Sequence, residues 1–300
     1  MAELSLAARD AIERAIQAHA LPDGFLDTVR SVYMPLARWL SGRVQQTPRH
    51  IVGIQGSQGS GKSTAADFLK LLLHHEHGLR VTVVSIDDFY LTKSERVTLA
   101  NRVHPLFTTR GVPGTHDVAW LMQTFQAFKH GQSIELPVFN KGSDDRAPEA
   151  EWNRLAETTD VLILEGWCVG IPPQLERALT HPVNDLERTE DAEGHWRRYV
   201  NEQLAAEYAR VFAQLDTLVT LEAPSFDCVW AWRRLQEQKL IDRLEAAGAD
   251  TKDTLNDVEL HRFISHYQRL TEHALSELGA RADARLSLAA DHGFTQIKLS

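Results

Sequence analysis

The sequence predicts an α/β fold in which helices cover both faces of a mainly parallel central sheet, forming a three-layer sandwich. Strand-like and helix-like segments alternate along the 300 residues, which is typical of parallel sheets. The run at 160–166 is continuously apolar, like a strand buried on both faces. A glycine-rich stretch at 56–63 joins a β-prone run to a helical pattern. We expect a single domain over residues 1–300, with 1–47 as an N-terminal helical extension packed on it.

The glycine-rich stretch satisfies the spacing G-x-x-x-x-G-K-[ST], with the strand before and the helix after that a phosphate-binding loop requires. Glycines let successive backbone N–H groups point at one oxyanion, and the helix adds its positive N-terminal end. We expect Lys62 to reach the β- and γ-phosphates of ATP and the Ser63 hydroxyl to bind Mg²⁺. The fold is therefore expected to be of the P-loop NTPase type. The predicted nucleotide contacts are Gly56, Ser57, Gln58, Gly59, Ser60, Gly61, Lys62, Ser63 and Thr64.

Periodicity sets the other elements. Apolar residues at three-to-four spacing predict two helices between 4 and 43, and Pro35 must kink the second or stand in the first turn of a new helix. Residues 92–115, 140–148 and 184–194 are expected to be loops. Further helices are predicted at 63–77, 116–130, 196–215, 226–243 and 257–278, and strands at 80–86, 134–139, 160–166, 217–221, 285–290 and 294–299.

Composition excludes several classes of partner. The net charge of −9 disfavours duplex nucleic acid and membrane surfaces, because those partners need a basic face. No long apolar run or secretion signal is visible, and the two cysteines, Cys168 and Cys228, lack metal-ligand spacing. We expect a reduced, cytoplasmic protein with free thiols that acts on a small molecule. Nothing in the sequence bears on the oligomeric state.

Acidic residues stand where two predicted strands end. Asp87 and Asp88 follow the strand at 80–86, and Glu165 ends the strand at 160–166. Carboxyl ends of parallel strands meet at the edge of the sheet where ligands bind. The predicted Mg²⁺ ligands are Ser63, Asp87 and Glu165. For Asp88 the sequence leaves two roles open, a magnesium ligand or a structural acid.

Two adjacent arginines, Arg233 and Arg234, follow the end of the strand at 217–221. We expect them to fold over the phosphates as a catalytic lid that neutralises the transferring group together with Lys62. The alternative is a solvated basic face of a helix.

Four motifs carry a family resemblance: Ser-Ile-Asp-Asp-Phe-Tyr-Leu-Thr at 85–92, Arg-Gly-Val-Pro-Gly-Thr-His-Asp at 110–117, Phe-Asn-Lys at 139–141 with Asp-Arg at 145–146, and Glu-Gly-Trp at 165–167 with Gly170. Over roughly residues 25–300 the chain resembles the D-glycerate 3-kinase family, within the branch of P-loop kinases that includes uridine kinase, phosphoribulokinase and bacterial pantothenate kinase. The resemblance implies ATP, Mg²⁺ and Asp87 as the general base. A hydroxyl that attacks the γ-phosphate needs such a carboxylate to take its proton.

The resemblance implies transfer of the γ-phosphate to a hydroxyl of a small hydroxy acid, most simply D-glycerate, giving 3-phosphoglycerate. Arg110 offers a fork that matches the carboxylate, although it could instead pin its loop by pairing with Asp117. The alternatives are a pantothenate-like or nucleoside-like acceptor, or a non-catalytic ATP-binding regulatory protein. The predicted acceptor contacts are Asp87, Tyr90, His104, Arg110, Lys141 and Arg146.

Overall fold

The computed structural model describes residues 3–22, 24–246, 248 and 254–300, and the predicted α/β architecture is confirmed there. The main sheet of the described chain has the strand order β10-β9-β8-β1-β7-β2, and all neighbouring strands are parallel except the β9–β10 hairpin. Its strands are β1 (His50–Gly56), β2 (Val81–Ser85), β7 (Val161–Gly166), β8 (Thr217–Glu222), β9 (Ala284–Leu288) and β10 (Phe294–Leu299).

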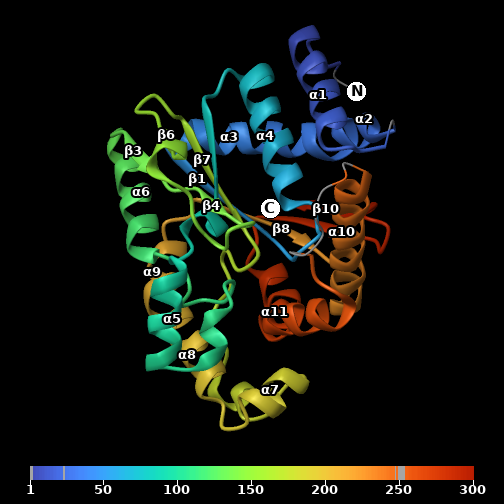
Figure 1. Ribbon diagram of the computed structural model, residues 1–300. Helices are drawn as coiled ribbons and strands as arrows, with labels where there is room; N and C mark the ends of the chain where they lie inside the picture. Colours follow the sequence, from blue (N-terminus) through green and yellow to red (C-terminus); the bar gives the residue numbers. More distant parts are fainter. Residues whose placement is uncertain (1–2, 23, 247, 249–253) are drawn as a thin grey trace.

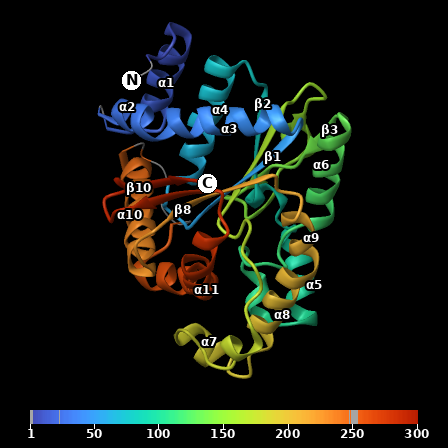
Figure 2. The same cartoon turned by 180° about the vertical axis from the view of Figure 1, so that it is seen from behind.

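The helices lie on both sides of this sheet, as Figures 1 and 2 show from opposite directions. The N-terminal helices and the helix that follows the phosphate loop lie together on one side: α1 (Leu6–Ala18), α2 (Phe25–Thr28), α3 (Met34–Gln46) and α4 (Lys62–His77). Pro35 stands at the start of α3, directly after a π-helical turn at Val29–Tyr33, so the chain remains helical through it. The helices on the other side include α5 (Lys93–Arg102), α8 (His195–Gln203), α9 (Ala209–Phe212) and α11 (Asp257–Glu277).

Three further helices complete the flanks. The helix α6 (Val118–His130) ends at Gly131, as predicted. The long helix α10 (Phe226–Ala246) runs beside β10, and α7 (Asp185–Glu190) lies at the end of the molecule farthest from α1 (Figure 1).

The central strands are level with one another at their carboxyl ends. Both β1 and β7 are buried along their whole length, as the apolar run predicts. Their register places Gln55 beside Gly166, and β2 pairs with β7 so that Ser85 lies beside Glu165. The segments that follow β1, β7 and β2 therefore meet at one edge of the sheet.

Two of the predicted loops are partly helical. In each helix a charged residue occupies a buried position, so the sequence lacks the apolar residue that would have indicated a buried helical face. In α5 the wholly buried residue is Arg96, and a capping box between Thr92 and Glu95 starts the helix. In α7 the buried residues are Leu186 and Glu187, and Glu187 pairs with Arg269. Short 3-10 turns, such as Pro105–Thr108, account for more of the predicted loops.

The strand expected at 134–139 is divided in two. The first part, β3 (Ile134–Leu136), pairs with β6 (Asn153–Leu155). The second part, β4 (Phe139–Asn140), pairs with β5 (Asp145–Arg146) to make a small hairpin. Cys168 and Cys228 are free thiols, as predicted. None of the described helices combines the length and the apolar character needed to cross a membrane.

Candidate active site

A cleft of about 900 Å³ lies at the carboxyl ends of the central strands. Its walls come from the phosphate loop, the segments after β2 and β7, and the helices α10 and α11. The predicted site residues that line it are Gln58, Gly59, Lys62, Ser63, Asp87, Tyr90, Arg110, Lys141 and Arg233. Residues from distant parts of the sequence thus converge where the register of the sheet places the strand ends.

The phosphate loop joins β1, which ends at Gly56, to α4, which begins at Lys62. Gly59 and Gly61 have φ values of +79° and +83°, which side chains other than glycine rarely adopt. A Cβ on Gly59 would lie 2.6 Å from the Cβ of Trp232, so α10 packs directly against the loop. The buried hydroxyls of Ser57 and Ser60 have no hydrogen-bond partner among the described residues. Together with the helix N-terminus, this polar lining fits a phosphate group.

A hydroxyl and a carboxylate meet beside the loop. The Ser63 hydroxyl donates to Glu165 Oε1 at 2.9 Å, while Glu165 Oε2 is buried without a partner in the described chain. No group of three His, Cys, Asp or Glu side chains among the described residues could hold a metal ion. Mg²⁺ is often held by one or two protein oxygens together with substrate phosphates, and Ser63 and Glu165 fit that mode of binding.

Both oxygens of Asp87 are engaged. Tyr90 donates to Oδ1 at 2.9 Å, and the Lys141 ammonium lies 2.7 Å from Oδ2. Burial by itself raises the pKa of Asp87, but the charges of Lys141 and Lys62 outweigh it and hold the pKa well below its usual range. Asp87 is therefore an ionised carboxylate, able to accept a hydrogen bond from a hydroxyl.

Asp88 has the opposite environment. Burial raises its pKa to about 6, with a further contribution from the neighbouring charge of Asp87. The backbone N–H of Phe139 donates to its Oδ1 at 3.2 Å. Asp88 does not line the cleft, so its contacts are those of a structural acid that connects the β2 end to the hairpin.

Arg110 lines the cleft from the loop before α6. Its guanidinium lies 5.4 Å from the centre of the Phe139 ring and donates to Asp144 Oδ1. Its backbone carbonyl accepts from Tyr267 at 3.1 Å. The next residue, Gly111, has a φ of +135°, and a Cβ there would lie 2.1 Å from the Tyr267 hydroxyl. Glycine at this position therefore allows α11 to approach and support the arginine.

Comparison with known proteins gives the family. Residues 51–173 match the family model described as Phosphoribulokinase / Uridine kinase family. An uncharacterized kinase, mug58 of Schizosaccharomyces pombe, is 37% identical over 226 residues, which cover 72% of this chain and 78% of that protein. The chain belongs to the phosphoribulokinase/uridine kinase family. Membership of this family implies phosphotransfer from ATP.

Two further similar proteins are named D-glycerate 3-kinase. The chloroplastic D-glycerate 3-kinase of Arabidopsis thaliana is 27% identical over 255 residues, which cover 78% of this kinase but 52% of that protein. This kinase thus spans about half the length of the plant enzyme. A structure of D-glycerate 3-kinase from Cryptococcus neoformans superposes with a TM-score of 0.74 at 24% identity, covering 90% of this chain and 99% of that one. That likeness is one of fold.

The structure separates the two predicted lid arginines. Arg233 lines the cleft, and its guanidinium pairs with the buried Glu237 at 2.7 Å. Arg234 lies outside the cleft lining and forms an exposed ion pair with Asp257 at 2.8 Å. Adjacent residues on a helix point about 100° apart, so the pair does not act as one unit. Of the two arginines, only Arg233 lines the cleft.

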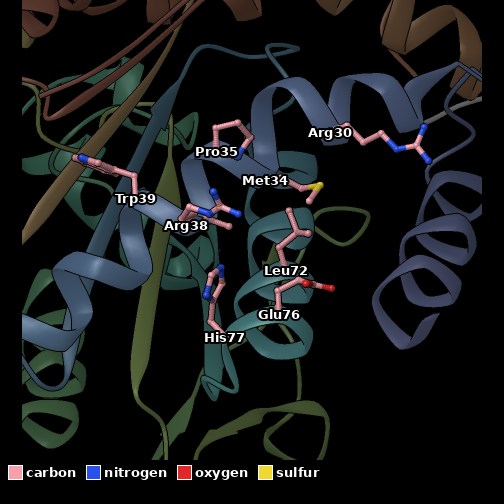
Figure 3. Close-up of a pocket in the computed structure, with 9 residues that line it drawn as sticks. Arg30, Met34, Pro35, Arg38, Trp39, Leu72, Glu76 and His77 are labelled. Atoms are coloured by element: carbon pink, nitrogen blue, oxygen red, sulfur yellow. The ribbon is translucent and has the colours of Figure 1, made fainter. Parts of the chain in front are cut away.

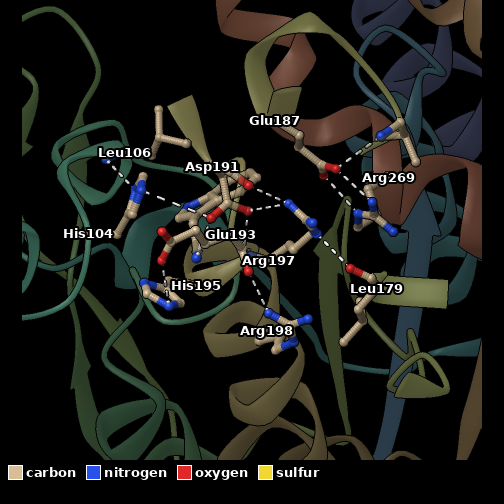
Figure 4. A network of polar contacts seen from close by, with 12 residues as sticks. His104, Leu106, Leu179, Glu187, Asp191, Glu193, His195, Arg197, Arg198 and Arg269 are labelled. Atoms are coloured by element: carbon tan, nitrogen blue, oxygen red, sulfur yellow. Dashed lines mark hydrogen bonds and ion pairs between the residues drawn. The ribbon is translucent and has the colours of Figure 1, made fainter. Parts of the chain in front are cut away.

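Two predicted acceptor contacts lie elsewhere. His104 belongs to a polar network between α5 and α8, where its Nδ1 accepts from the N–H of Leu106 and its Nε2 lies 4.0 Å from Asp191 (Figure 4). Arg146 donates to the backbone carbonyl of Tyr90 at 3.2 Å and stacks on Trp120 at 5.1 Å. Neither lines the cleft, so the structure does not bring them to the acceptor. The sequence places both in loops near the motifs but does not show their orientation.

Aromatic residues complete the wall of the cleft near Arg110. Trp167, directly after β7, donates to the carbonyl of Gly111 at 2.9 Å and packs edge-on against Tyr267, with 4.8 Å between ring centres. The sequence indicates that Trp167 lies at the cleft, because it directly follows the strand that ends in Glu165 and Gly166. Tyr267 has no such signal, because it stands within an ordinary amphipathic pattern on α11.

The buried His116 supports Tyr90 from behind. Its ring stacks on Tyr90 with 4.5 Å between ring centres, and its Nδ1 lies 2.6 Å from the Tyr208 hydroxyl. Burial lowers the pKa of His116 to about 4, so it is neutral at pH 7. It therefore holds Tyr90 against Asp87 without adding charge.

A second hollow of about 420 Å³ lies between α3 and α4, on the N-terminal helical layer (Figure 3). Met34 and Leu72 form its apolar part, and Arg38 and His77 its polar part. No predicted site residue lines it. The large cleft is therefore the candidate active site.

Proposed function

We propose that this kinase phosphorylates a small hydroxy acid and that its acceptor is D-glycerate, with 3-phosphoglycerate as the product. The observation that carries the proposal is that Arg110 lines the same cleft as Asp87 and the phosphate loop. A guanidinium there can hold a carboxylate through two parallel N–H bonds. The acceptor hydroxyl then lies between the arginine and the phosphate loop, within reach of the Asp87 carboxylate.

Asp87 is the proposed general base. As an ionised carboxylate it accepts the proton of the acceptor hydroxyl when the oxygen attacks the γ-phosphorus, and the bond between that phosphorus and the bridging oxygen of ADP breaks. Tyr90, which donates to Oδ1, fixes the orientation of the carboxylate. Lys141 occupies Oδ2 and must move from it for the hydroxyl to approach.

Cations around the γ-phosphate supply the remaining stabilisation. Lys62 at the start of α4 and Arg233 on α10 both face the cleft, and each neutralises charge that develops on the transferring group. Mg²⁺, held by Ser63 and Glu165 together with the nucleotide, would neutralise further negative charge on the phosphates. The aromatic walls from Trp167 and Tyr267 exclude water from the acceptor end, which limits hydrolysis of ATP.

The size and charge of the acceptor end support a small anion. The chain has a net charge of −9, so an anion binds only where cations converge, as they do at Arg110 and Lys141. The relatives from Arabidopsis and Cryptococcus that bear the name D-glycerate 3-kinase also support D-glycerate as the acceptor. Pantothenate, a nucleoside or no acceptor at all are the competing possibilities.

The test measures ATP consumption and product identity. The purified kinase with ATP and Mg²⁺ is assayed against D-glycerate, glycerol, pantothenate and uridine, and ³¹P NMR identifies the phosphorylated position. We expect D-glycerate to raise ADP release far above the rate without acceptor. Equal activity with glycerol, or preference for pantothenate or uridine, would contradict the proposal that Arg110 binds a carboxylate of a small hydroxy acid. No stimulation by any small alcohol would favour a non-catalytic ATP-binding protein.

A variant then tests the arginine itself. Arg110→Lys keeps the charge but loses the fork, so we expect KM for D-glycerate to rise by about tenfold or more, while KM for ATP changes by less than about twofold. Arg102→Lys, an exposed position on α5, is the matched control. A rise in KM for ATP equal to that for D-glycerate would place Arg110 at the nucleotide.

A further inference from the structure

Asp144 lies between two arginines at the tip of the β4–β5 hairpin. Its Oδ2 accepts from Arg96 Nη2 at 2.6 Å, and its Oδ1 accepts from Arg110. The Arg96 side chain is 1% exposed, whereas that of Arg110 is 21% exposed and faces the cleft. One carboxylate is thus shared between a buried guanidinium and the guanidinium proposed to hold the acceptor.

The hairpin holds Asp144 firmly. Asp144 adopts a φ of +54°, and Asn140 Oδ1 accepts from the backbone N–H groups of Gly142 and Ser143 at 2.9 and 3.2 Å. Phe139, on the first strand of the hairpin, packs against the guanidiniums of both Arg96 and Arg110. These contacts fix the hairpin tip and both guanidiniums around the Asp144 carboxylate.

Arg96 does not depend on Asp144 alone for hydrogen bonds. It also donates to the carbonyls of Leu91 at 2.8 Å, Thr108 at 3.3 Å and Asp144 at 3.0 Å. Carbonyl oxygens satisfy the N–H groups but do not cancel the charge. Asp144 is consequently the group in contact with both guanidiniums that neutralises one of their two positive charges.

The net charge of the acceptor end can be counted from these contacts. Two guanidiniums and one carboxylate leave a single net positive charge. Lys141, the cation of the same hairpin that lines the cleft, is paired with Asp87 at 2.7 Å. A ligand that carries one carboxylate balances this site, while a ligand with two carboxylates brings an unpaired negative charge into a partly dehydrated cleft.

We propose that Asp144 is a specificity-determining residue that matches the acceptor end to a monocarboxylate and disfavours a dicarboxylate of the same size. This inference rests on the proposed function, because it concerns the acceptor site of that reaction. It acts through Arg110, so Asp144 is a positioning residue and does not itself touch the acceptor.

Two competitive inhibitors measure the effect. D-Lactate and tartronate resemble D-glycerate in size, lack its terminal hydroxyl, and carry one and two carboxylates. The ratio of the tartronate Ki to the D-lactate Ki, both measured against D-glycerate, reports the charge preference. We expect Asp144→Asn, which leaves both guanidiniums without their anion, to lower this ratio by about tenfold, as expected for one added unit charge at short range. Glu149→Gln, the same charge change at an exposed position after the hairpin, should leave the ratio within about twofold.

A second change separates charge from geometry. In the double variant Arg96→Met with Asp144→Asn the contact charge returns to that of the wild-type protein, so the ratio should return towards the wild-type value. Should Asp144→Asn fail to fold, Arg96→Met alone lowers the contact charge by one, and the ratio must rise. An unchanged ratio in whichever variant folds overturns the inference.

The outcomes also distinguish this inference from the proposed function. A wild-type kinase that phosphorylates D-glycerate, with a ratio that Asp144→Asn leaves unaltered, overturns the charge role of Asp144 alone. A wild-type kinase that neither turns over D-glycerate nor binds D-lactate overturns both. Binding of ATP, measured in parallel, should be equal in all variants and shows that the phosphate end is intact.

Discussion

The two ends of the cleft are built in different ways. The phosphate end is built mainly from one contiguous stretch, the loop at 56–63, whose buried Ser57 Oγ and Ser60 Oγ have no partner among the described residues. The acceptor end is assembled from several separate segments, and its charged groups are already paired within the protein, as in Lys141 with Asp87 and Arg110 with Asp144. The phosphate end thus has unpaired polar atoms available to a ligand, whereas the charges of the acceptor end are already paired with residues of the β4–β5 hairpin.

This difference suggests how the chain divides its tasks. A phosphate is common to all reactions of the family, so a backbone cradle with fixed geometry serves it. The acceptor must be distinguished from similar small molecules, and side chains paired with one another can be exchanged only by a ligand of matching charge. Variants at the phosphate end, and at the Asp87 base, should therefore affect turnover most, and the other variants at the acceptor end should affect selectivity.

The largest effect is expected at Lys62. Lys62→Ala removes a cation that faces the transferring group, and we expect kcat to fall by about 10³–10⁵ while the thermal unfolding midpoint stays close to wild type. Lys70→Ala, on an exposed turn of the same helix, is the control. Wild-type turnover in Lys62→Ala would show that the phosphates bind elsewhere.

Asp87 should give the next largest effect. Asp87→Asn keeps the shape of the side chain but cannot take a proton, so we expect a loss of about 10²–10⁴ in kcat with little change in the affinity for ATP. Asp88→Asn should lose far less, because Asp88 lies outside the cleft lining. A larger loss in Asp88→Asn would exchange the roles of these neighbours.

The two lid arginines provide a matched comparison. Arg233→Gln removes a charge from the cleft yet can still hydrogen-bond to Glu237, and we expect kcat to fall by about 10-fold to 100-fold. Arg234→Gln removes only an exposed ion pair and should stay within about twofold. Equal losses in both variants would indicate that α10 moves when the site closes and brings Arg234 inward.

The smallest effect concerns stability and pH. The pKa of Asp88 rises from 3.8 to about 6 in the folded protein because of burial, so the folded state is favoured while Asp88 is protonated. That contribution is lost as pH rises from about 4 through 6. We expect Asp88→Asn to be more stable than wild type by about 1–3 kcal/mol at pH 7.5 and to show no such gain at pH 4. Denaturant unfolding in EDTA without nucleotide measures this; a difference independent of pH contradicts it.

The sequence predicts the phosphate end better than the acceptor end for a physical reason. The loop from Gly56 to Ser63 is local, so its spacing alone specifies its geometry. The apolar run of β7 likewise specifies a central strand and, with it, the location of Glu165. At the acceptor end the contacts join residues far apart in the chain, such as Arg110 with Tyr267. No local pattern encodes them.

Buried charges account for the other differences. Helices α5 and α7 lie in segments that the sequence predicts as loops, one from its glycines and prolines and the other from its acidic residues. Arg96 and Glu187 occupy buried positions there, at which a helical pattern would normally show apolar side chains. The orientations of His104 and Arg146 depend on partners such as Asp191 and the Tyr90 carbonyl. Burial of a charge depends on its partner in space, and the sequence of one chain does not show that partner.

The packing of the phosphate loop also bears on the order in which the protein is made. The loop at 56–63 is made before the segments that cover its outer side, which are Trp232 and His292, whose Nε2 lies 2.8 Å from the carbonyl oxygen of Gly59. A growing chain that has not yet reached residue 292 therefore carries the phosphate-binding motif without the wall that supports it. Tight retention of ATP should arise only after residue 292 has left the ribosome and packed against the loop.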